Sequence, residues 1–249
     1  MPSNYSMHYC VDIVMCIDAT GSMGPLLNTV KENALKFYDD LVKTMTEKNK
    51  SIYEVRVKVI AFRDYLADGK DAMMVSDFYT LPEEASAFED RVKSIKPFGG
   101  GDDPEDGLEA LAYAIRSNWT TGGHKRRHII IVWTDEGTHP LGYGKNPQNG
   151  KSLEKMCGIM MDEVKKNARY YPEGMAKDFD ELTDWWGDAD LPGSMDNDAK
   201  RLLIYAPNEN YWSTISDVWN KVIHHQTMAG QGLEEIEYQE ILNFIANTI

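Results

Sequence analysis

Apolar runs alternate with segments of helical spacing along most of the chain. Residues 9–17 form a continuous apolar run interrupted only by Asp12, which is typical of a central strand covered on both faces. Apolar residues then recur at helical spacing over 22–48. The same patterns predict further strands at 55–62, 74–79, 128–133 and 201–205, and further helices at 82–95, 104–115, 153–169, 173–186, 211–224 and 238–246.

This alternation predicts an α/β fold with a Rossmann-like, doubly wound and mostly parallel sheet that carries helices on both faces. We expect the strand order 3-2-1-4-5-6, with the short third strand as an antiparallel edge. The 249 residues contain no repeat and no linker-like tract, so we expect a single domain over 1–249. Within it, residues 137–200 separate two predicted strands and are expected to form a helical and loop insertion.

Composition narrows the choice of partner and compartment. A formal net charge of −14 repels phosphate groups, so we expect neither nucleic acid nor an anionic membrane as a partner. No apolar stretch approaches the roughly 20 residues that cross a bilayer, and the first residues lack the pattern of a signal peptide. Three cysteines without metal-binding spacing suit a reducing compartment, so we expect the cytoplasm.

Three polar segments stand at one edge of the predicted sheet. They are DATGS at 18–22, GGGDDPE at 99–105 and TDEG at 134–137. Each segment follows the carboxyl end of a strand or lies in a loop on that side, and this is the edge where open α/β sheets bind ligands.

The first segment suits a metal ion because Asp18, Thr20 and Ser22 alternate with small residues. In a tight turn this alternation can direct three oxygens toward one point, and hard divalent cations prefer oxygen ligands. A second interpretation is that Thr20 or Ser22 caps the following helix. Capping and coordination are compatible with each other.

The three segments, taken in order, resemble the metal-ion-dependent adhesion site of the von Willebrand factor A domain. The resemblance covers residues 9–135 well, is weaker over 200–249, and accommodates 137–200 only as an insertion. It implies that Asp18, Thr20, Ser22 and Asp135 hold one divalent cation at the top of the sheet. The implied ion is Mg²⁺, with Mn²⁺ or Ca²⁺ as alternatives.

The middle segment departs from the family pattern. Counting back from Gly107 places Asp102 where the family usually has threonine, and Asp103 is the other candidate ligand. The form GGGDDPE resembles intracellular bacterial members found in tellurite-resistance and conflict systems. A third carboxylate at the ion would raise its affinity for the metal and weaken the pull of the metal on an external acidic ligand.

Two classes of function follow. The first is a non-enzymatic, metal-dependent protein–protein interaction module, whose partner completes the metal coordination with an acidic side chain and which belongs to a bacterial stress-response or defence complex. The alternative is a Mg²⁺-dependent phosphohydrolase of haloacid-dehalogenase type with Asp18 as the nucleophile. That mechanism needs a second aspartate two residues later, where this chain has Thr20.

Other residues have two interpretations each. Arg63 and Asp64, which follow the second strand, could rim the metal site or form a surface ion pair. His139 could reach the site or lie in a solvated loop. Trp185 and Trp186 could form an exposed recognition patch, although aromatic residues in this context are more often part of a core.

Three weaker features receive structural interpretations. The basic stretch 125–128 is expected to be a solvated turn before a strand, and His224 and His225 are expected to be structural. Cys157, which lies among methionines, is expected on the core face of a helix.

Overall fold

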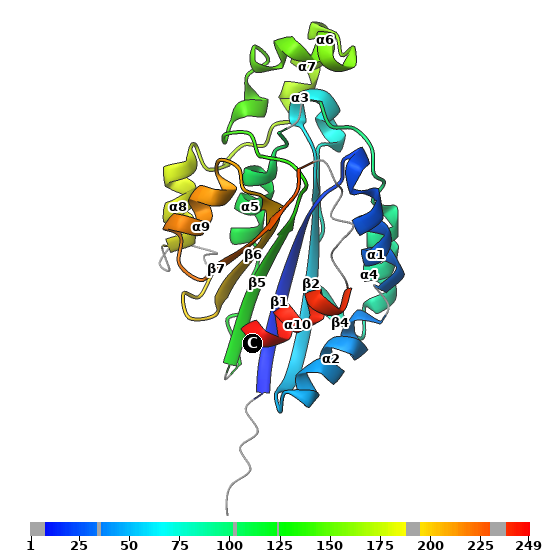
Figure 1. Ribbon diagram of the computed structural model, residues 1–249, viewed down its shortest axis with the longest axis vertical. Coiled ribbons are helices and arrows are strands. Elements are labelled where there is room, and N and C mark those ends of the chain that lie inside the picture. Colours follow the sequence, from blue (N-terminus) through cyan, green and yellow to red (C-terminus); the bar gives the residue numbers. More distant parts are fainter. Residues whose placement is uncertain (1–7, 34–35, 102–103, 124, 188–194, 230–237) are drawn as a thin grey trace, which may run out of the picture.

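The protein forms one mixed sheet with helices on both faces (Figure 1). The computed structural model describes residues 8–33, 36–101, 104–123, 125–187, 195–229 and 238–249. The strands are β1 (His8–Asp18), β2 (Ser51–Phe62), β3 (Met73–Val75), β4 (Tyr79–Leu81), β5 (Lys125–Trp133), β6 (Lys200–Pro207) and β7 (Val222–Thr227). The α-helices are α1 (Gly24–Asn33), α2 (Phe37–Glu47), α3 (Tyr65–Asp68), α4 (Ala85–Ser94), α5 (Gly107–Ile115), α6 (Leu153–Cys157), α7 (Met161–Asn167), α8 (Phe179–Gly187), α9 (Trp212–Val218) and α10 (Tyr238–Thr248).

The sheet has the order β3-β2-β1-β5-β6-β7, and β4 also pairs with β2. Strands β2, β1, β5, β6 and β7 are parallel, whereas β3 and β4 pair with β2 in the antiparallel sense. The predicted order and the antiparallel edge are therefore confirmed.

The last strand, β7, lies partly in a segment that the sequence analysis wrongly assigned to a helix over 211–224. Val218 and Val222 continue the helical spacing, but α9 ends at Val218 and a positive φ of 60° at Lys221 turns the chain into β7.

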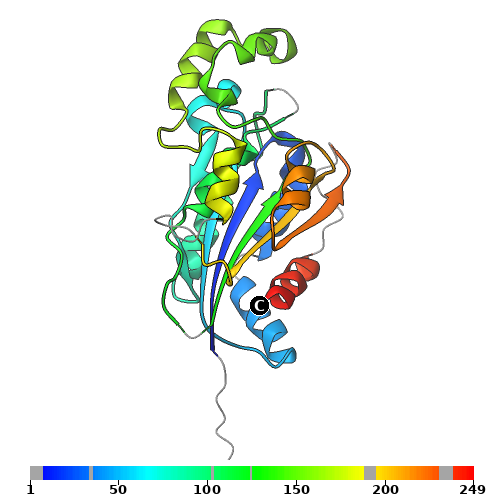
Figure 2. The ribbon, with the colours of Figure 1, turned by 90° about the vertical axis from the view of Figure 1, so that its left-hand side faces the viewer.

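Alternation along the central strand divides the core into two halves. Val11, Ile13, Met15 and Ile17 face the core half that α1, α2, α4 and α10 cover. Val14 and Cys16 face the other half, with α5, α8 and α9 (Figure 2). Both faces of β1 are thus buried, as its continuous apolar run predicts.

Several predicted helices are shorter or divided. The helix predicted over 22–48 is divided into a 3-10 turn, α1 and α2, and the helix predicted over 153–169 into α6, α7 and a 3-10 turn. Gly158, with φ of 76°, ends α6 in the left-handed conformation that glycine adopts without strain. The stretch 125–128 belongs to β5, so its assignment to a solvated turn is wrong.

Residues 134–199 connect β5 to β6 and contain two parts. Residues 139–171, which we call the cap, include α6 and α7 and lie above the carboxyl ends of the strands (Figure 1). The cap packs on α3 through Leu66, Leu153 and Val164.

The remainder of the connection between β5 and β6 includes α8, whose Trp185 and Trp186 are buried in the core beside α5 and α9. The core interpretation of these tryptophans is therefore confirmed. Among the described residues, no helix combines the length and apolar character needed to cross a membrane.

A close contact fixes the start of α5 and gives a test of the packing. A Cβ built on Gly107 would lie 2.7 Å from Trp212 Cζ2, and the Trp212 side chain is fully buried. We expect Gly107→Ala to lower the free energy of unfolding by about 1–3 kcal/mol through overpacking, although alanine favours helices. Chemical denaturation measures the change. Gly122→Ala, where nothing lies within 4 Å of the added carbon, is the matched control, and equal stability of both variants would contradict the packing.

Candidate metal centre

The carboxyl ends of β1 and β5 bring two of the three predicted segments together. Thr20 Oγ1 donates a hydrogen bond to Asp18 Oδ1 at 2.6 Å, and it lies 3.4 Å from Ser22 Oγ. Ser22 Oγ in turn donates to Asp135 Oδ1 at 3.0 Å. Asp18, Thr20, Ser22 and Asp135 thus form a continuous series of oxygen contacts, which we call the oxygen chain.

The turn after β1 sets the direction of these side chains. The backbone N–H of Thr20 donates to Asp18 Oδ1 at 2.9 Å, so the carboxylate of Asp18 holds its own turn. Thr20 has the extended backbone of an N-cap residue before the 3-10 turn Gly21–Met23, but its side chain bonds no N–H of that turn. Its hydroxyl contacts Asp18 and Ser22 instead, so simple capping does not account for it.

Thr134 begins the third predicted segment, but the sequence analysis gave it no role. Its hydroxyl donates to Asp18 Oδ2 at 2.8 Å, so each carboxylate oxygen of Asp18 accepts a hydroxyl hydrogen bond. Thr134 is the first residue after β5, the strand that pairs with β1. The position of this residue at a strand end beside Asp18 was the available signal.

Two buried carboxyl groups, those of Asp18 and Glu105, lie close together at this edge of the sheet. Asp18 is fully buried, and burial raises its pKa to about 6 against the opposing effect of hydrogen bonds from Thr20 and Thr134. Glu105 is also buried, and burial together with the charge of Asp18 raises its pKa well above the ordinary value. A bound cation would favour the ionised form of both groups.

The middle segment adjoins the oxygen chain from the other side. Asp102 and Asp103 lie outside the described residues, but the loop before them lies against Thr20. A Cβ built on Gly100 would be 3.1 Å from Thr20 Cγ2, and the N–H of Gly100 donates to Asp68 Oδ2 at 3.0 Å. The middle segment therefore approaches the same sheet edge as the segments at 18–22 and 134–137.

The oxygen chain fits a hard cation by its chemistry, because carboxylate and hydroxyl oxygens are the ligands that Mg²⁺ and Ca²⁺ prefer. Across the described ranges, no three His, Cys, Asp or Glu side chains form a group that could hold a metal. The described donors are two carboxylates, from Asp18 and Asp135, and two hydroxyls, from Thr20 and Ser22.

Arg63 and Asp64 are buried, so of their two interpretations the surface ion pair is wrong. The guanidinium of Arg63 donates to the backbone carbonyls of Ala19, Phe98, Asp71 and Lys96 at 2.6–2.9 Å. Asp64 caps α3 by accepting from the N–H groups of Leu66 and Ala67. Arg63 therefore holds the loops that surround the oxygen chain.

Comparison with protein families identifies the fold family. A model of the von Willebrand factor type A domain matches residues 13–138, just over half of the chain. The chain belongs to this family. Domains of the family commonly mediate protein–protein interactions, and the match does not favour the phosphohydrolase alternative.

Several solved structures resemble this one at low identity. A von Willebrand factor type A protein from Catenulispora acidiphila is 12% identical, with 96% of this chain and 42% of that chain covered and a TM-score of 0.45. The von Willebrand domain of the type V pili tip protein Mfa5 from Porphyromonas gingivalis is 18% identical, with coverages of 56% and 47% and a TM-score of 0.35. The open conformation of the pilus adhesin SpaC from Lactobacillus rhamnosus GG is 13% identical, with coverages of 96% and 30% and a TM-score of 0.43.

The chain spans less than half the length of each of these three structures. No curated protein matches it.

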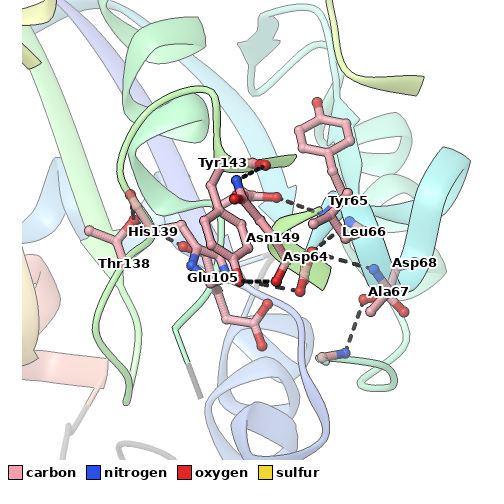
Figure 3. A network of polar contacts seen from close by, with 12 residues as sticks. Asp64, Tyr65, Leu66, Ala67, Asp68, Glu105, Thr138, His139, Tyr143 and Asn149 are labelled. Atoms are coloured by element: carbon pink, nitrogen blue, oxygen red, sulfur yellow. Dashed lines mark hydrogen bonds and ion pairs between the residues drawn. The ribbon is translucent and has the colours of Figure 1, made fainter. Parts of the chain in front are cut away.

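This von Willebrand domain has a second buried acidic group, between α5 and the cap, which the sequence analysis missed. It contains Asp64, Asp106 and Glu109, all fully buried, and Figure 3 shows its edge near Asp64 and Glu105. His139 Nε2 lies 3.8 Å from Asp64 Oδ2, and its ring stacks on Tyr143 with centroids 3.6 Å apart. His139 is buried, so the solvated-loop interpretation is wrong.

Glu109 joins α5 to the cap. Its Oε1 accepts from the N–H of Gly142 at 3.0 Å and from the hydroxyl of Tyr171 at 2.9 Å. Asp106 Oδ2 accepts from the N–H of Tyr65 at 2.6 Å, which ties the same helix to α3. The two buried carboxylates therefore position both elements that overhang the strand ends.

The remaining predictions divide between confirmation and correction. His224 contacts the carbonyl of Ala206 at 2.9 Å, and the His225 ring packs on those of Tyr205 and Phe244, which confirms their structural role. Cys157 is exposed, so its assignment to a core face is wrong. α6 buries only Leu153, and the neighbouring Met156 and Met160 are exposed.

Replacing Arg63 tests its role in holding the loops. We expect Arg63→Ala and Arg63→Lys each to lower the free energy of unfolding by about 3 kcal/mol or more. A buried carbonyl without a donor costs about 1–3 kcal/mol, and lysine cannot reproduce the planar fork of donors. Urea denaturation measures the loss, with exposed Arg169→Lys as the control. A variant Arg63→Lys as stable as the parent would contradict this role.

The buried acidic group predicts a pH-dependent effect. Burial raises the pKa of both Asp106 and Glu109, and the negative charge of Glu109 adds to the rise at Asp106. A carboxyl whose folded pKa lies above its unfolded value contributes stability at low pH and loses it as pH rises through the folded pKa. Glu109→Gln keeps the acceptor oxygen without the charge.

We therefore expect the stability of Glu109→Gln relative to the parent to be greater at about pH 8 than at about pH 5. Urea midpoints at the two pH values provide the comparison, and Glu154→Gln, an exposed position, serves as the control. A stability difference that is the same at both pH values would show that Glu109 does not titrate in this way.

Proposed function

We propose that this von Willebrand domain is a metal-dependent protein–protein interaction module that binds one divalent cation at the oxygen chain. The observation that carries the proposal is the series of contacts from Asp18 through Thr20 and Ser22 to Asp135, which unites two segments 113 residues apart. Mg²⁺ is the proposed ion, with Mn²⁺ or Ca²⁺ as alternatives, because all the donors are oxygens.

In this proposal, Asp18, Thr20, Ser22 and Asp135 hold the ion together with Asp102, or with Asp103 in its place. Thr134 is a positioning residue, because its hydroxyl fixes the second oxygen of Asp18. The ion would act as a Lewis acid that accepts a carboxylate oxygen from the partner. The chain itself orients the donors and keeps Asp18 away from solvent.

We further propose a cytoplasmic setting, as part of a bacterial stress-response or defence complex. Among the described residues, Cys10, Cys16 and Cys157 form no disulfide bond, which supports a reducing compartment. The net charge of −14 supports a protein partner over nucleic acid or an anionic membrane.

Metal binding can be separated from folding with Asp18→Asn. The amide keeps an acceptor oxygen for Thr20 and removes the buried charge, so we expect a melting temperature at least as high as that of the metal-free parent. Mg²⁺ at about 100 times its Kd should stabilise the parent by about 2.7 kcal/mol, or about 5–10 °C, and leave the variant unchanged.

Differential scanning fluorimetry in EDTA and in Mg²⁺ measures both effects. Asp90→Asn, on the exposed side of α4, is the control and should respond to Mg²⁺ as the parent does. An equal Mg²⁺ response in Asp18→Asn and the parent would place the ion elsewhere. Loss of the Mg²⁺ response in Ser22→Ala as well would support binding of the ion at the oxygen chain.

A further inference from the structure

The cap has a charge opposite to that of the rest of the chain. Its basic residues outnumber its acidic residues by six to three, in a protein whose net charge is −14. The basic residues are all exposed: Lys145, Lys151, Lys155, Lys165, Lys166 and Arg169. The cap therefore presents a local positive surface on a molecule that is otherwise strongly negative.

Large apolar side chains are exposed among these charges. The exposed fractions are 55% for Met156, 59% for Met160 and 45% for Tyr170. Cys157, beside Met156, is exposed as well. Methionine is flexible and polarizable, and clustered exposed methionines are typical of surfaces that bind apolar side chains of a partner. The inward contacts of the cap are made by Leu153 and Val164, so these exposed side chains are not needed for its packing.

This surface adjoins the proposed metal centre. The loop of Gly100 and Gly101 lies between them: a Cβ on Gly100 would be 3.1 Å from Thr20 Cγ2, and one on Gly101 would be 2.7 Å from Leu153 Cδ2. Leu153 begins α6, which carries Met156. A partner that reaches the ion could therefore contact the cap at the same time.

We propose that the cap docks an acidic, amphipathic segment of the protein partner, with acidic side chains on the lysines and apolar side chains on the methionines. Charge complementarity selects this occupant. Screening at physiological salt limits electrostatic attraction to about 8 Å, so a short acidic segment interacts mainly with the cap. An extended anionic membrane or nucleic acid would also meet the negative remainder of the chain.

The inference rests on the proposed function for the partner's carboxylate at the ion, but the cap surface can be tested separately. The probe is a displayed library of random peptides of about 16 residues, selected on the immobilised full chain in Mg²⁺ without counter-selection on any cap variant. The selected peptides are then synthesised, and their Kd values are measured by fluorescence anisotropy in Mg²⁺ and in EDTA.

We expect the selected peptides to be acidic, with apolar residues at helical spacing. Their Kd should rise at least about tenfold for Lys151→Glu/Lys155→Glu and for Met156→Ser/Met160→Ser. The matched controls are Lys43→Glu/Lys48→Glu and Met228→Ser, which make the same changes at exposed positions outside the cap and should leave Kd unchanged. Melting temperatures establish that each variant is folded.

The outcomes separate this inference from the proposed function. Binding that falls in the cap variants and persists in EDTA supports the docking surface as a contact separate from the ion. Binding that is lost in EDTA but equal in all cap variants overturns the docking surface and leaves the metal proposal intact. Peptides without acidic excess, or binding of the parent to phosphatidylserine vesicles but to no acidic peptide, also overturn it.

Discussion

The guanidinium of Arg63 is the contact on which the upper edge of the sheet depends. It stands directly after β2 and bonds carbonyls from the turn after β1, the segment before the glycine-rich loop and the turn after α3. Its burial is tolerated because every one of these acceptors is a backbone oxygen that would otherwise need another donor. The turn after β1, which leads into the oxygen chain, and the turn after α3, the helix on which the cap packs, thus share one cationic centre.

Four buried carboxyl groups lie at the same end of the molecule as this cation. Asp18, Glu105, Asp106 and Glu109 are all buried at the same end of the molecule, and burial raises the pKa of each. A fold selected for stability alone would avoid such a group of carboxyls, since a buried charge without compensation is unfavourable. Their presence is understandable where a ligand or a neighbouring element depends on them, as Gly142 and Tyr171 depend on Glu109.

The sequence was informative where the pattern was local and long. The apolar run of β1 predicted a central strand, and the alternating oxygens after it predicted the contacts of Asp18, Thr20 and Ser22. It was uninformative where tertiary contacts decide the outcome. Nothing in the spacing of Arg63 indicates that four distant carbonyls enclose it.

The short strand β7 was hidden because its valine continued the spacing of a helix. His139 looks like a solvated loop residue, but it is buried against Asp64 and Tyr143. The exposed Cys157 looks like a core residue because methionines surround it in the sequence. In each case the missing information was which surface another segment covers, and a single sequence does not encode this locally.

Glu109 anchors both ends of the cap to α5. Because Gly142 and Tyr171 bond to the same oxygen, the two ends of the cap meet, and the residues between them leave and return at one point of the sheet edge. The entropic cost of closing a loop rises only slowly with its length. Segments of very different length can therefore be accommodated between these two anchor points. The cap is therefore the part of this domain that evolution can replace as a unit, changing what the molecule recognises while β1, β5 and the oxygen chain stay as they are.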